Sequence, residues 1–210
     1  MVAKLYCFGE SGNAYKAALT MTLAGYPWEP VFVDFFNGAS RSPEFLALNE
    51  MGEAPVLVED GQTISQSGVM QLRVAEKTGK FGGAPEDRDE VMRWLFWDNH
   101  KGSSQFGALR FLMNFLPEEK RPQQAIQWLS GRVQAALKTL EGHLQSREWM
   151  VGDGPTIADF ACCGYLYYPE PFGFERAQFP AISAWLDRIA ALPGWQHPYD
   201  LMPGNPSDRA

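Results

Sequence analysis

Residues 6–16 read YCFGESGNAYK, and this stretch joins a strand to a helix. The apolar run that stops at Gly9 predicts a short buried strand over residues 2–8. A helix face then recurs at the spacing i, i+3, i+4 and i+7, formed by Ala14, Ala17, Ala18 and Met21. Two small oxygen-bearing side chains, Ser11 and Asn13, lie between strand and helix. The junction therefore either caps the helix or holds a ligand.

The next segment predicts a crossover back into the same sheet. Gly25-Tyr26-Pro27 ends the first helix. Residues 31–36, VFVDFF, are rich in Val and Phe and predict a second strand. Ser42-Pro43-Glu44 is typical of a helix start and predicts one or two helical turns, through Leu48.

A hairpin and a helix complete the first half. Residues 54–59 predict a strand entered through Pro55, Asp60-Gly61 predicts a tight turn, and residues 62–64 return. A helix opens at residues 65–67 and stops at Gly79. The order β-α-β-(α)-β-β-α combines a parallel crossover with an antiparallel hairpin, so we expect an α/β domain over residues 1–79.

The second half of the chain is predicted to be entirely helical. Residues 80–86, KFGGAPE, form a Gly/Pro-rich linker, and residues 87–210 show no strand alternation. The expected helices cover residues 87–116, 123–146, 156–168 and 180–192, and the chain ends in a polar tail, PGNPSDRA. Thr156 and Asp159 resemble a capping box ahead of the third helix, which is a folding role rather than a catalytic one.

Composition excludes several kinds of partner. The net charge is −7 without a basic run, which argues against nucleic-acid binding. No apolar run is long enough to span a membrane, and the N-terminus is too short and too polar for a signal peptide. The three histidines are far apart and show no metal-ligand spacing. The three cysteines, Cys7, Cys162 and Cys163, predict neither a disulfide framework nor a zinc site, so we expect a reducing, cytoplasmic location.

Three segments of the first half allow a bland and a functional interpretation. Ser11 and Asn13 match neither a phosphate loop nor a nucleophile elbow, and capping explains only one of them. Pro55 is either an ordinary strand-start proline or a cis proline that turns the Ala54 backbone towards a ligand. Gln66-Ser67 either caps a helix or offers that helix N-terminus to a carboxylate.

Taken in order, these pieces resemble the cytosolic glutathione transferase family, in a serine-type, bacterial-like form. The stretches that carry the resemblance are YCFGESGNAYKAAL, SPEFLALNEMGEAPVL, ISQSGVMQL and GPTIADF. The resemblance covers nearly the whole chain. It implies a thioredoxin-like first domain that binds glutathione, and an all-α second domain that forms the co-substrate pocket. It also implies a homodimer, no tightly bound cofactor and a role in detoxification.

The resemblance also assigns roles to individual residues. Ser11 would donate its hydroxyl to the glutathione sulfur, with Asn13 as the fallback donor and the expected helix cap. The backbone of Ala54, before a cis Pro55, would pair with the cysteinyl part. Glutathione's γ-glutamyl end would lie on Gln66 and Ser67, and its glycine carboxylate on Arg41. The family often has a basic residue where this chain has Glu53, which predicts either that Glu53 points away or that glutathione binds more weakly.

The co-substrate pocket and the reaction are less closely specified. The residues expected to line the pocket are Trp97, His100, Phe106, Phe111 and Tyr165. The sequence leaves two alternatives open for the polar band formed by residues 98–101: it lines a cleft or a subunit interface, or it has neither role. The expected activity is conjugation of glutathione to small, mostly hydrophobic electrophiles. The alternatives are disulfide or peroxide reduction with glutathione, and a non-catalytic binding or scaffold protein, which Glu53 favours. Glu10 is expected to be a solvated surface charge. The three cysteines are expected to be inert buried thiols.

Overall fold

The computed structural model describes residues 2–204 and divides the chain into two compact units. The first unit comprises the chain up to Gly82 together with the segment from Leu192 onward, and the second comprises Gly83–Ala191. The sequence pattern places the segment after Leu192 in the helical domain. The structure instead packs that segment on the first unit.

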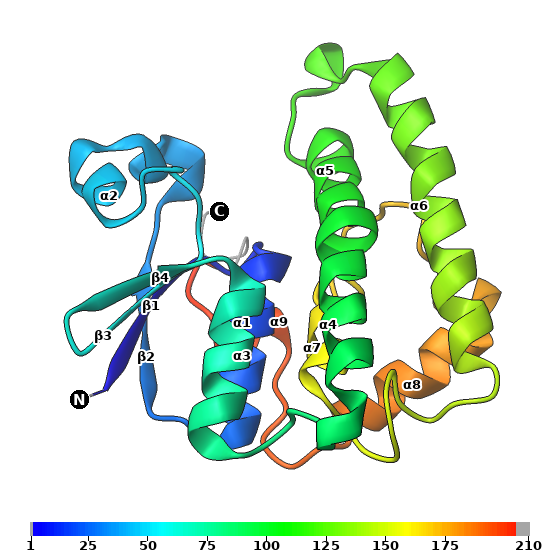
Figure 1. Cartoon of the computed structure of the whole chain (residues 1–210). Helices are drawn as coiled ribbons and strands as arrows, with labels where there is room; N and C mark the ends of the chain where they lie inside the picture. The colour runs from blue at the N-terminus through cyan, green and yellow to red at the C-terminus, as the bar shows by residue number, and fades with distance from the viewer. Residues whose placement is uncertain (1, 205–210) are drawn as a thin grey trace. The chain divides into compact units, whose positions relative to one another are not determined.

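The first unit is built on a four-stranded mixed sheet in the order β2-β1-β3-β4 (Figure 1). Its strands are β1 (Ala3–Cys7), β2 (Trp28–Phe32), β3 (Val56–Glu59) and β4 (Gln62–Ser65). β1 and β2 are parallel, whereas β1–β3 and β3–β4 are antiparallel. The predicted crossover and hairpin are therefore confirmed, and the fold is that of an α/β unit followed by a helical unit.

Two long helices and one short one accompany this sheet. They are α1 (Gly12–Ala24), α3 (Ser67–Thr78) and α2 (Pro43–Leu48). α1 and α3 pack against each other (Figure 1), and Gln71 of α3 donates a buried hydrogen bond of 3.0 Å to Thr20 of α1. Gly25 and Gly79 end α1 and α3 in the left-handed conformation, as glycines after helices commonly do.

A separate apolar cluster forms where β1 and β3 meet the segment that contains α2. Phe8, Val33, Phe45 and Val56 are all buried there. The rings of Phe8 and Phe35 stack with their centroids 4.8 Å apart. Ala54 packs against the same cluster, and this packing holds the backbone just before Pro55 in place.

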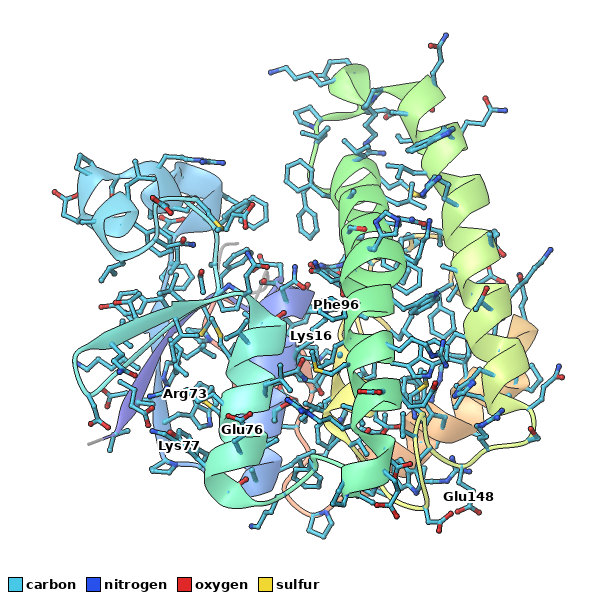
Figure 2. The ribbon with its side chains drawn as sticks, in the orientation of Figure 1. Lys16, Arg73, Glu76, Lys77, Phe96 and Glu148 are labelled. Carbon is cyan, nitrogen blue, oxygen red and sulfur yellow. The ribbon has the colours of Figure 1, made fainter. Side chains whose placement is uncertain are left out.

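A charged cluster ties the far end of the sheet to α3. The buried carboxylate of Glu59 accepts hydrogen bonds from Tyr26, from Arg73 at 3.0 Å and from Lys77 at 2.6 Å. Arg73 and Lys77 project from α3 towards the sheet (Figure 2). Desolvation would raise the pKa of Glu59, but these three donors outweigh it and lower the pKa to about 2.

The second unit is made of helices only, among the residues that the structure describes. They are α4 (Arg88–Trp97), α5 (Ser103–Asn114), α6 (Gln123–Leu144), α7 (Ile157–Cys162) and α8 (Pro180–Ala190). α4 and α5 are one continuous helix interrupted by a π turn at Asp98–Gly102. No helix in residues 2–204 is long and apolar enough to cross a membrane.

The predicted capping box is confirmed and anchors this unit. The buried Asp159 carboxylate accepts from both the N–H and the hydroxyl of Thr156, at 2.8 and 3.0 Å. It also accepts from the Met150 N–H and from the indole N–H of Trp185, each at 2.8 Å. Asp159 therefore joins three segments of the unit, and its role is structural.

Two predicted elements differ from the structure. The second strand covers Trp28–Phe32, not residues 31–36, because Phe35–Asn37 forms a 3₁₀ turn in which the partly buried Phe35 ring stacks on Phe8. The helix predicted over residues 156–168 ends at Cys162, and turns follow it. Apolar composition extends beyond the helix there, because the residues that follow are buried in turns. The polar tail lies, from residue 205 onward, outside the described residues.

Candidate functional site

The register of the sheet brings three of the predicted segments to one end of it. Tyr6 of β1 pairs with Val56 of β3, and Val56 pairs with Ser65 of β4. β1 and β4 therefore end on the same edge of the sheet on which β3 begins, and this edge is formed by strand ends rather than by an edge strand. This edge carries Ser11, the Ala54–Pro55 bond and Gln66-Ser67, in that order across β1, β3 and β4.

Ser11 is the N-cap of α1. Its backbone is extended, and its hydroxyl oxygen accepts a hydrogen bond of 3.1 Å from the Ala14 N–H. The side chain is 6% exposed. Because the oxygen already accepts one donor from the protein, the hydroxyl proton is left to be donated outward. Ser11 can thus cap the helix and still donate to a ligand.

Asn13 does not cap the helix, so the expectation that it would do so is wrong. α1 begins at Gly12, which places Asn13 inside the first turn. Its side-chain oxygen instead accepts a hydrogen bond of 3.1 Å from the Lys16 ammonium. Lys16 is buried, and it lies on α1 (Figure 2). A buried cation close to a helix N-terminus adds to the positive potential that this end already has.

Sequence reasoning missed two charged residues beside Ser11. Glu10, expected to be a solvated surface charge, is only 3% exposed, and Lys16 is only 1% exposed. Nothing in the local pattern distinguishes them from surface charges. Tyr15, which precedes Lys16 in α1, is completely buried as well.

The Ala54–Pro55 peptide bond is cis, as the functional interpretation of Pro55 requires. Gln66 has φ +68°, a left-handed conformation that residues other than glycine rarely adopt. Such a residue costs of the order of 1–3 kcal/mol, and strained residues of this kind gather at binding sites. Gln66 immediately precedes Ser67, the first residue of α3, where the helix N–H groups point outward.

Arg41 and Gln66 both contact Met51. An Arg41 guanidinium nitrogen donates to the Met51 carbonyl oxygen at 3.3 Å, and the Gln66 amide contacts the Met51 sulfur at 3.5 Å. Arg41 is exposed and has no carboxylate partner among residues 2–204. Its guanidinium and the Gln66 amide are therefore connected through Met51.

Glu53 is exposed as well, and its backbone carbonyl accepts from the Asn49 amide at 2.8 Å. The contact fixes the backbone at Glu53 while the side chain remains in solvent. An exposed carboxylate repels a bound anion less than a buried one does, because water screens the interaction. In this exposed position the Glu53 carboxylate would repel the glycine carboxylate of glutathione only weakly.

The residues expected to line a co-substrate pocket have different environments in the helical unit. Phe106 is buried against Phe172, with ring centroids 5.6 Å apart. Tyr165 is also buried and lies against Gly107, where a Cβ atom would meet its hydroxyl at 2.8 Å. His100 and Phe111 are exposed. Their assignment to a co-substrate pocket stays a prediction.

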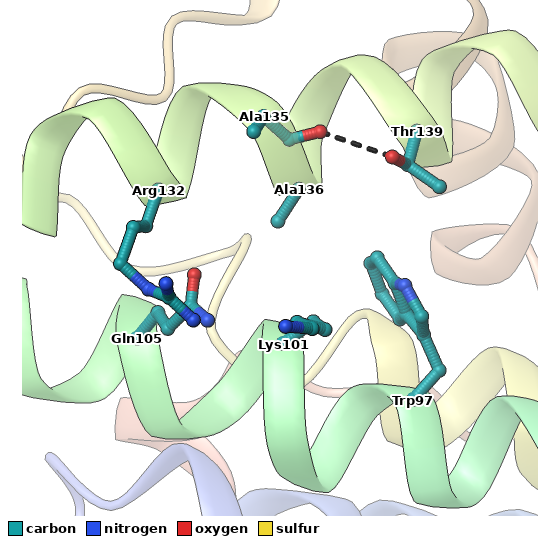
Figure 3. Close-up of a pocket in the computed structure, with 7 residues that line it drawn as sticks. All are labelled: Trp97, Lys101, Gln105, Arg132, Ala135, Ala136 and Thr139. Atoms are coloured by element: carbon teal, nitrogen blue, oxygen red, sulfur yellow. Dashed lines mark hydrogen bonds between the residues drawn. The ribbon is translucent and has the colours of Figure 1, made fainter.

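Trp97 lines a cavity of about 240 Å³ between the α4–α5 helix and α6 (Figure 3). The other lining residues are Lys101, Gln105, Arg132, Ala135, Ala136 and Thr139. Part of the polar band at residues 98–101 therefore faces a hollow: Lys101 does, whereas the buried carboxylate of Asp98 accepts from the Ser103 hydroxyl at 2.9 Å.

The three cysteines are buried and unpaired by disulfides. Burial raises the pKa of the Cys7 thiol to about 12, which removes its nucleophilicity near neutral pH. Among the described residues, no group of three or more His, Cys, Asp or Glu side chains is arranged to hold a metal ion.

Comparisons with known proteins point to one family. Residues 1–75 match the family model described as "Glutathione S-transferase, N-terminal domain", and residues 107–193 match "Glutathione S-transferase, C-terminal domain". A solved glutathione S-transferase from Xanthobacter autotrophicus is 33% identical with a TM-score of 0.87, and the match covers 99% of this chain and 100% of that one.

Of two further relatives, one has a name that states another activity and the other is again a glutathione transferase. The chain is 26% identical over 194 residues to the disulfide-bond oxidoreductase YfcG of Escherichia coli, and 89% of each is covered. It is also 26% identical to the glutathione transferase URE2P8 of Phanerochaete chrysosporium, solved with oxidised glutathione. The TM-score is 0.84, with 94% of this chain and 93% of that one covered.

Proposed function

Since this chain belongs to the glutathione S-transferase family, we propose that it transfers the glutathione thiolate to small, mostly hydrophobic electrophiles, with Ser11 stabilising the thiolate. The family uses glutathione as its co-substrate, without a tightly bound cofactor. The observation that carries the proposal is the geometry of Ser11. Its oxygen accepts the Ala14 N–H at the start of α1, so its proton is the one available to a ligand's sulfur.

The free energy that the sulfur needs is within reach of this arrangement. A free thiol has a pKa of about 8.5, so only a few per cent is ionised at neutral pH. Lowering that pKa by about 2 requires about 2.7 kcal/mol of preference for the anion. A hydrogen bond to a charged group contributes about 1.5–3 kcal/mol, and a helix N-terminus about 0.3–1 kcal/mol. Hence Ser11 and α1 suffice without a histidine base.

Glutathione would lie across the edge where β1, β3 and β4 meet. The Ala54 backbone before the cis Pro55 would pair with the cysteinyl part, and Gln66 and Ser67 would hold the γ-glutamyl end. Arg41 would bind the glycine carboxylate. The resemblance and the shared sheet edge support this placement.

The test is a thiolate titration with glutathione bound to the wild type and to Ser11→Ala and Asn13→Ala. The ultraviolet absorbance of the thiolate gives the pKa of the bound thiol, and conjugation of an activated aryl halide gives turnover. We expect Ser11→Ala to raise that pKa by 1–2 and to lower turnover 10- to 100-fold. Asn13→Ala is expected to change the pKa by less than about 0.5 and turnover by less than threefold. If Ser11→Ala keeps the wild-type pKa and turnover, Ser11 has no role in the mechanism.

A second reaction, glutathione-dependent disulfide reduction, is favoured by the relative that is named an oxidoreductase. The same thiolate would attack a disulfide instead of a carbon. The attack would break the S–S bond, form a mixed disulfide of glutathione with one half of the substrate and expel the other half as a thiolate. Because the cysteines are buried, a second glutathione would attack that mixed disulfide, giving oxidised glutathione and the second thiol. Turnover of a glutathione mixed disulfide that exceeds turnover of the aryl halide would favour this reaction. If calorimetry detects no glutathione binding at millimolar ligand, a non-catalytic binding protein is favoured instead.

We also propose a cytoplasmic homodimer. The location is supported by three buried thiols without a disulfide. Self-association is supported by the family and by exposed large side chains on the helical unit, among them Phe96 at 67% and Trp128 at 62%. Sedimentation at micromolar concentration gives the mass, and a monomer would contradict the dimer.

A further inference from the structure

The C-terminal segment of the described chain lies on the junction between β1 and α1. The Gly9 N–H donates a hydrogen bond of 2.6 Å to the Pro203 carbonyl oxygen. The Tyr15 hydroxyl donates at 2.9 Å to the Gln196 carbonyl oxygen. Both contacts lie inside the first unit. They hold the chain two residues before Ser11 and four residues after it.

Gly9 makes this close approach possible. A Cβ atom at Gly9 would lie 3.2 Å from Tyr199 Cδ1 and 3.3 Å from the carbonyl oxygens of Pro203 and Gly204. Two of these three neighbours are backbone atoms and cannot move aside by a change of rotamer. Any larger residue at this position would therefore displace either the C-terminal segment or the turn that leads to Ser11.

The C-terminal segment has defined structure where it crosses this junction. It contains the short helix α9 (Pro198–Leu201), whose N-cap His197 accepts the Tyr199 N–H through its ring nitrogen at 3.3 Å. The Met202 N–H donates to the Pro198 carbonyl oxygen at 3.1 Å, and the Met202 side chain is buried. The segment is thus anchored by packing as well as by its two hydrogen bonds.

The turn between these anchors is the one that orients the Ser11 hydroxyl. The Ser11 N–H donates to the Phe8 carbonyl oxygen at 3.1 Å, and the Tyr15 N–H donates to the Ser11 carbonyl oxygen at 2.9 Å. Gly9 lies within the turn that the hydrogen bond between Ser11 and Phe8 closes, and Tyr15 donates the hydrogen bond to the Ser11 carbonyl oxygen. A shift at either residue is therefore transmitted to the Ser11 backbone through one hydrogen bond.

We propose that residues 196–203 form a C-terminal strap that positions Ser11 against the sulfur of the bound thiol, with Gly9 and Tyr15 as its two attachment points. The inference rests on the proposed function, because it concerns the group that stabilises the thiolate. A hydrogen bond to a thiolate weakens steeply when its donor is displaced, and a misplacement of about 1 Å can cost 100-fold in rate. The strap then sets the acidity of the bound thiol and leaves the affinity for the protonated thiol form of glutathione unchanged.

Two variants detach the strap in different ways. Gly9→Ala adds a methyl group where the strap lies 3.2–3.3 Å away, and Tyr15→Phe removes only the hydroxyl that reaches Gln196. Gly131→Ala in α6 is the matched control, because nothing lies within 4 Å of a Cβ at that position. The measurements are the pKa of bound glutathione from thiolate absorbance, its dissociation constant from calorimetry, and hydrogen exchange over residues 8–15.

We expect Gly9→Ala to raise the pKa of the bound thiol by about 1, with a tenfold loss of thiolate below that pKa, and to lower kcat similarly. Tyr15→Phe is expected to give a threefold loss and faster amide exchange around Ser11. The dissociation constant of glutathione measured at about pH 5, where the bound thiol is protonated, should change by less than twofold, because Arg41, Ala54, Gln66 and Ser67 are untouched. Gly131→Ala should match the wild type in every measurement.

The outcomes separate the strap from the function on which it rests. If the wild type forms no thiolate with bound glutathione, both the proposed function and the strap are overturned. If the wild type and the Ser11→Ala comparison behave as proposed while Gly9→Ala and Tyr15→Phe keep a wild-type pKa, only the strap is overturned. A weakened affinity without a change in pKa also contradicts it. Should Gly9→Ala fail to fold, Tyr15→Phe decides the question.

Discussion

Replacing Glu59 with glutamine removes the negative charge at the centre of the cluster formed with Tyr26, Arg73 and Lys77. The carboxylate is buried, and its donors lie at the end of α1 and along α3. Burial alone would raise its pKa, yet the donors lower it from 4.5 to about 2. Folding therefore favours the ionised form of Glu59.

The sign of the pH dependence follows from that direction. A carboxylate whose pKa falls on folding stabilises the protein fully above its unfolded pKa, and the stabilisation is lost as the pH falls from about 4.5 to about 2. At about 1.4 kcal/mol per pKa unit, the full effect would be about 3 kcal/mol. Lys77 is 37% exposed, and solvent screening of its charge reduces this to about 2 kcal/mol.

Urea denaturation of the wild type and Glu59→Gln at pH 7 and pH 2.5 measures the effect. We expect Glu59→Gln to lower the free energy of unfolding by about 2 kcal/mol at pH 7 and by less than half of that at pH 2.5. Glu29→Gln is the control, because its pair with Lys4 is 3.7 Å long and both side chains are more than half exposed. A loss of equal size at both pH values would refute the electrostatic account, and would assign the effect to packing.

Three further outcomes are expected. Asp159→Ala leaves buried donors on Met150, Thr156 and Trp185 without their acceptor, which costs about 4 kcal/mol and lowers Tm by roughly 10 °C; a Tm within 3 °C of the wild type in calorimetry would contradict this. Gly102→Ala places a Cβ 2.7 Å from Asp98 Oδ1 and should destabilise the protein by 1–3 kcal/mol in urea, whereas Gly142→Ala, with open space around it, should not. With its pKa near 12, Cys7 should resist a thiol reagent at pH 8 until the chain unfolds, and rapid labelling of native protein at Cys7 would show that it is accessible.

The sheet and the edge that carries the candidate site were predictable because local signals coincide there. Asp60-Gly61 fixes the hairpin, Pro55 marks the start of β3, and Gly79 ends α3. Each is a backbone requirement that few residue types satisfy, so a single sequence reveals it. The glutathione roles of Ala54, Gln66 and Ser67 came from the resemblance and remain proposals.

The misplaced features depend on tertiary contacts instead. Ser11 and Asn13 are equally good caps by composition, and the choice of Ser11 follows from where α1 begins. Glu10 and Lys16 look like surface charges in the sequence, whereas the structure buries both. The segment after Leu192 lacks any local signal of the unit on which it packs, because its carbonyl groups accept hydrogen bonds from the distant Gly9 N–H and Tyr15 hydroxyl.

The π turn at Asp98–Gly102 lets the α4–α5 helix hold one residue more than an uninterrupted α-helix would. Deleting a single residue in this turn would therefore convert it into an ordinary α-helical turn and keep the side chains beyond it in the same rotational phase. Deleting one residue in the regular part of α4 would instead rotate every side chain of α5 by about 100° around the axis. Phe106, Leu109 and Arg110, which are buried, would stay in the core after the first deletion and leave it together after the second. The π turn is thus the position in this helix where a change of length by one residue acts on the turn alone and not on the whole of α5.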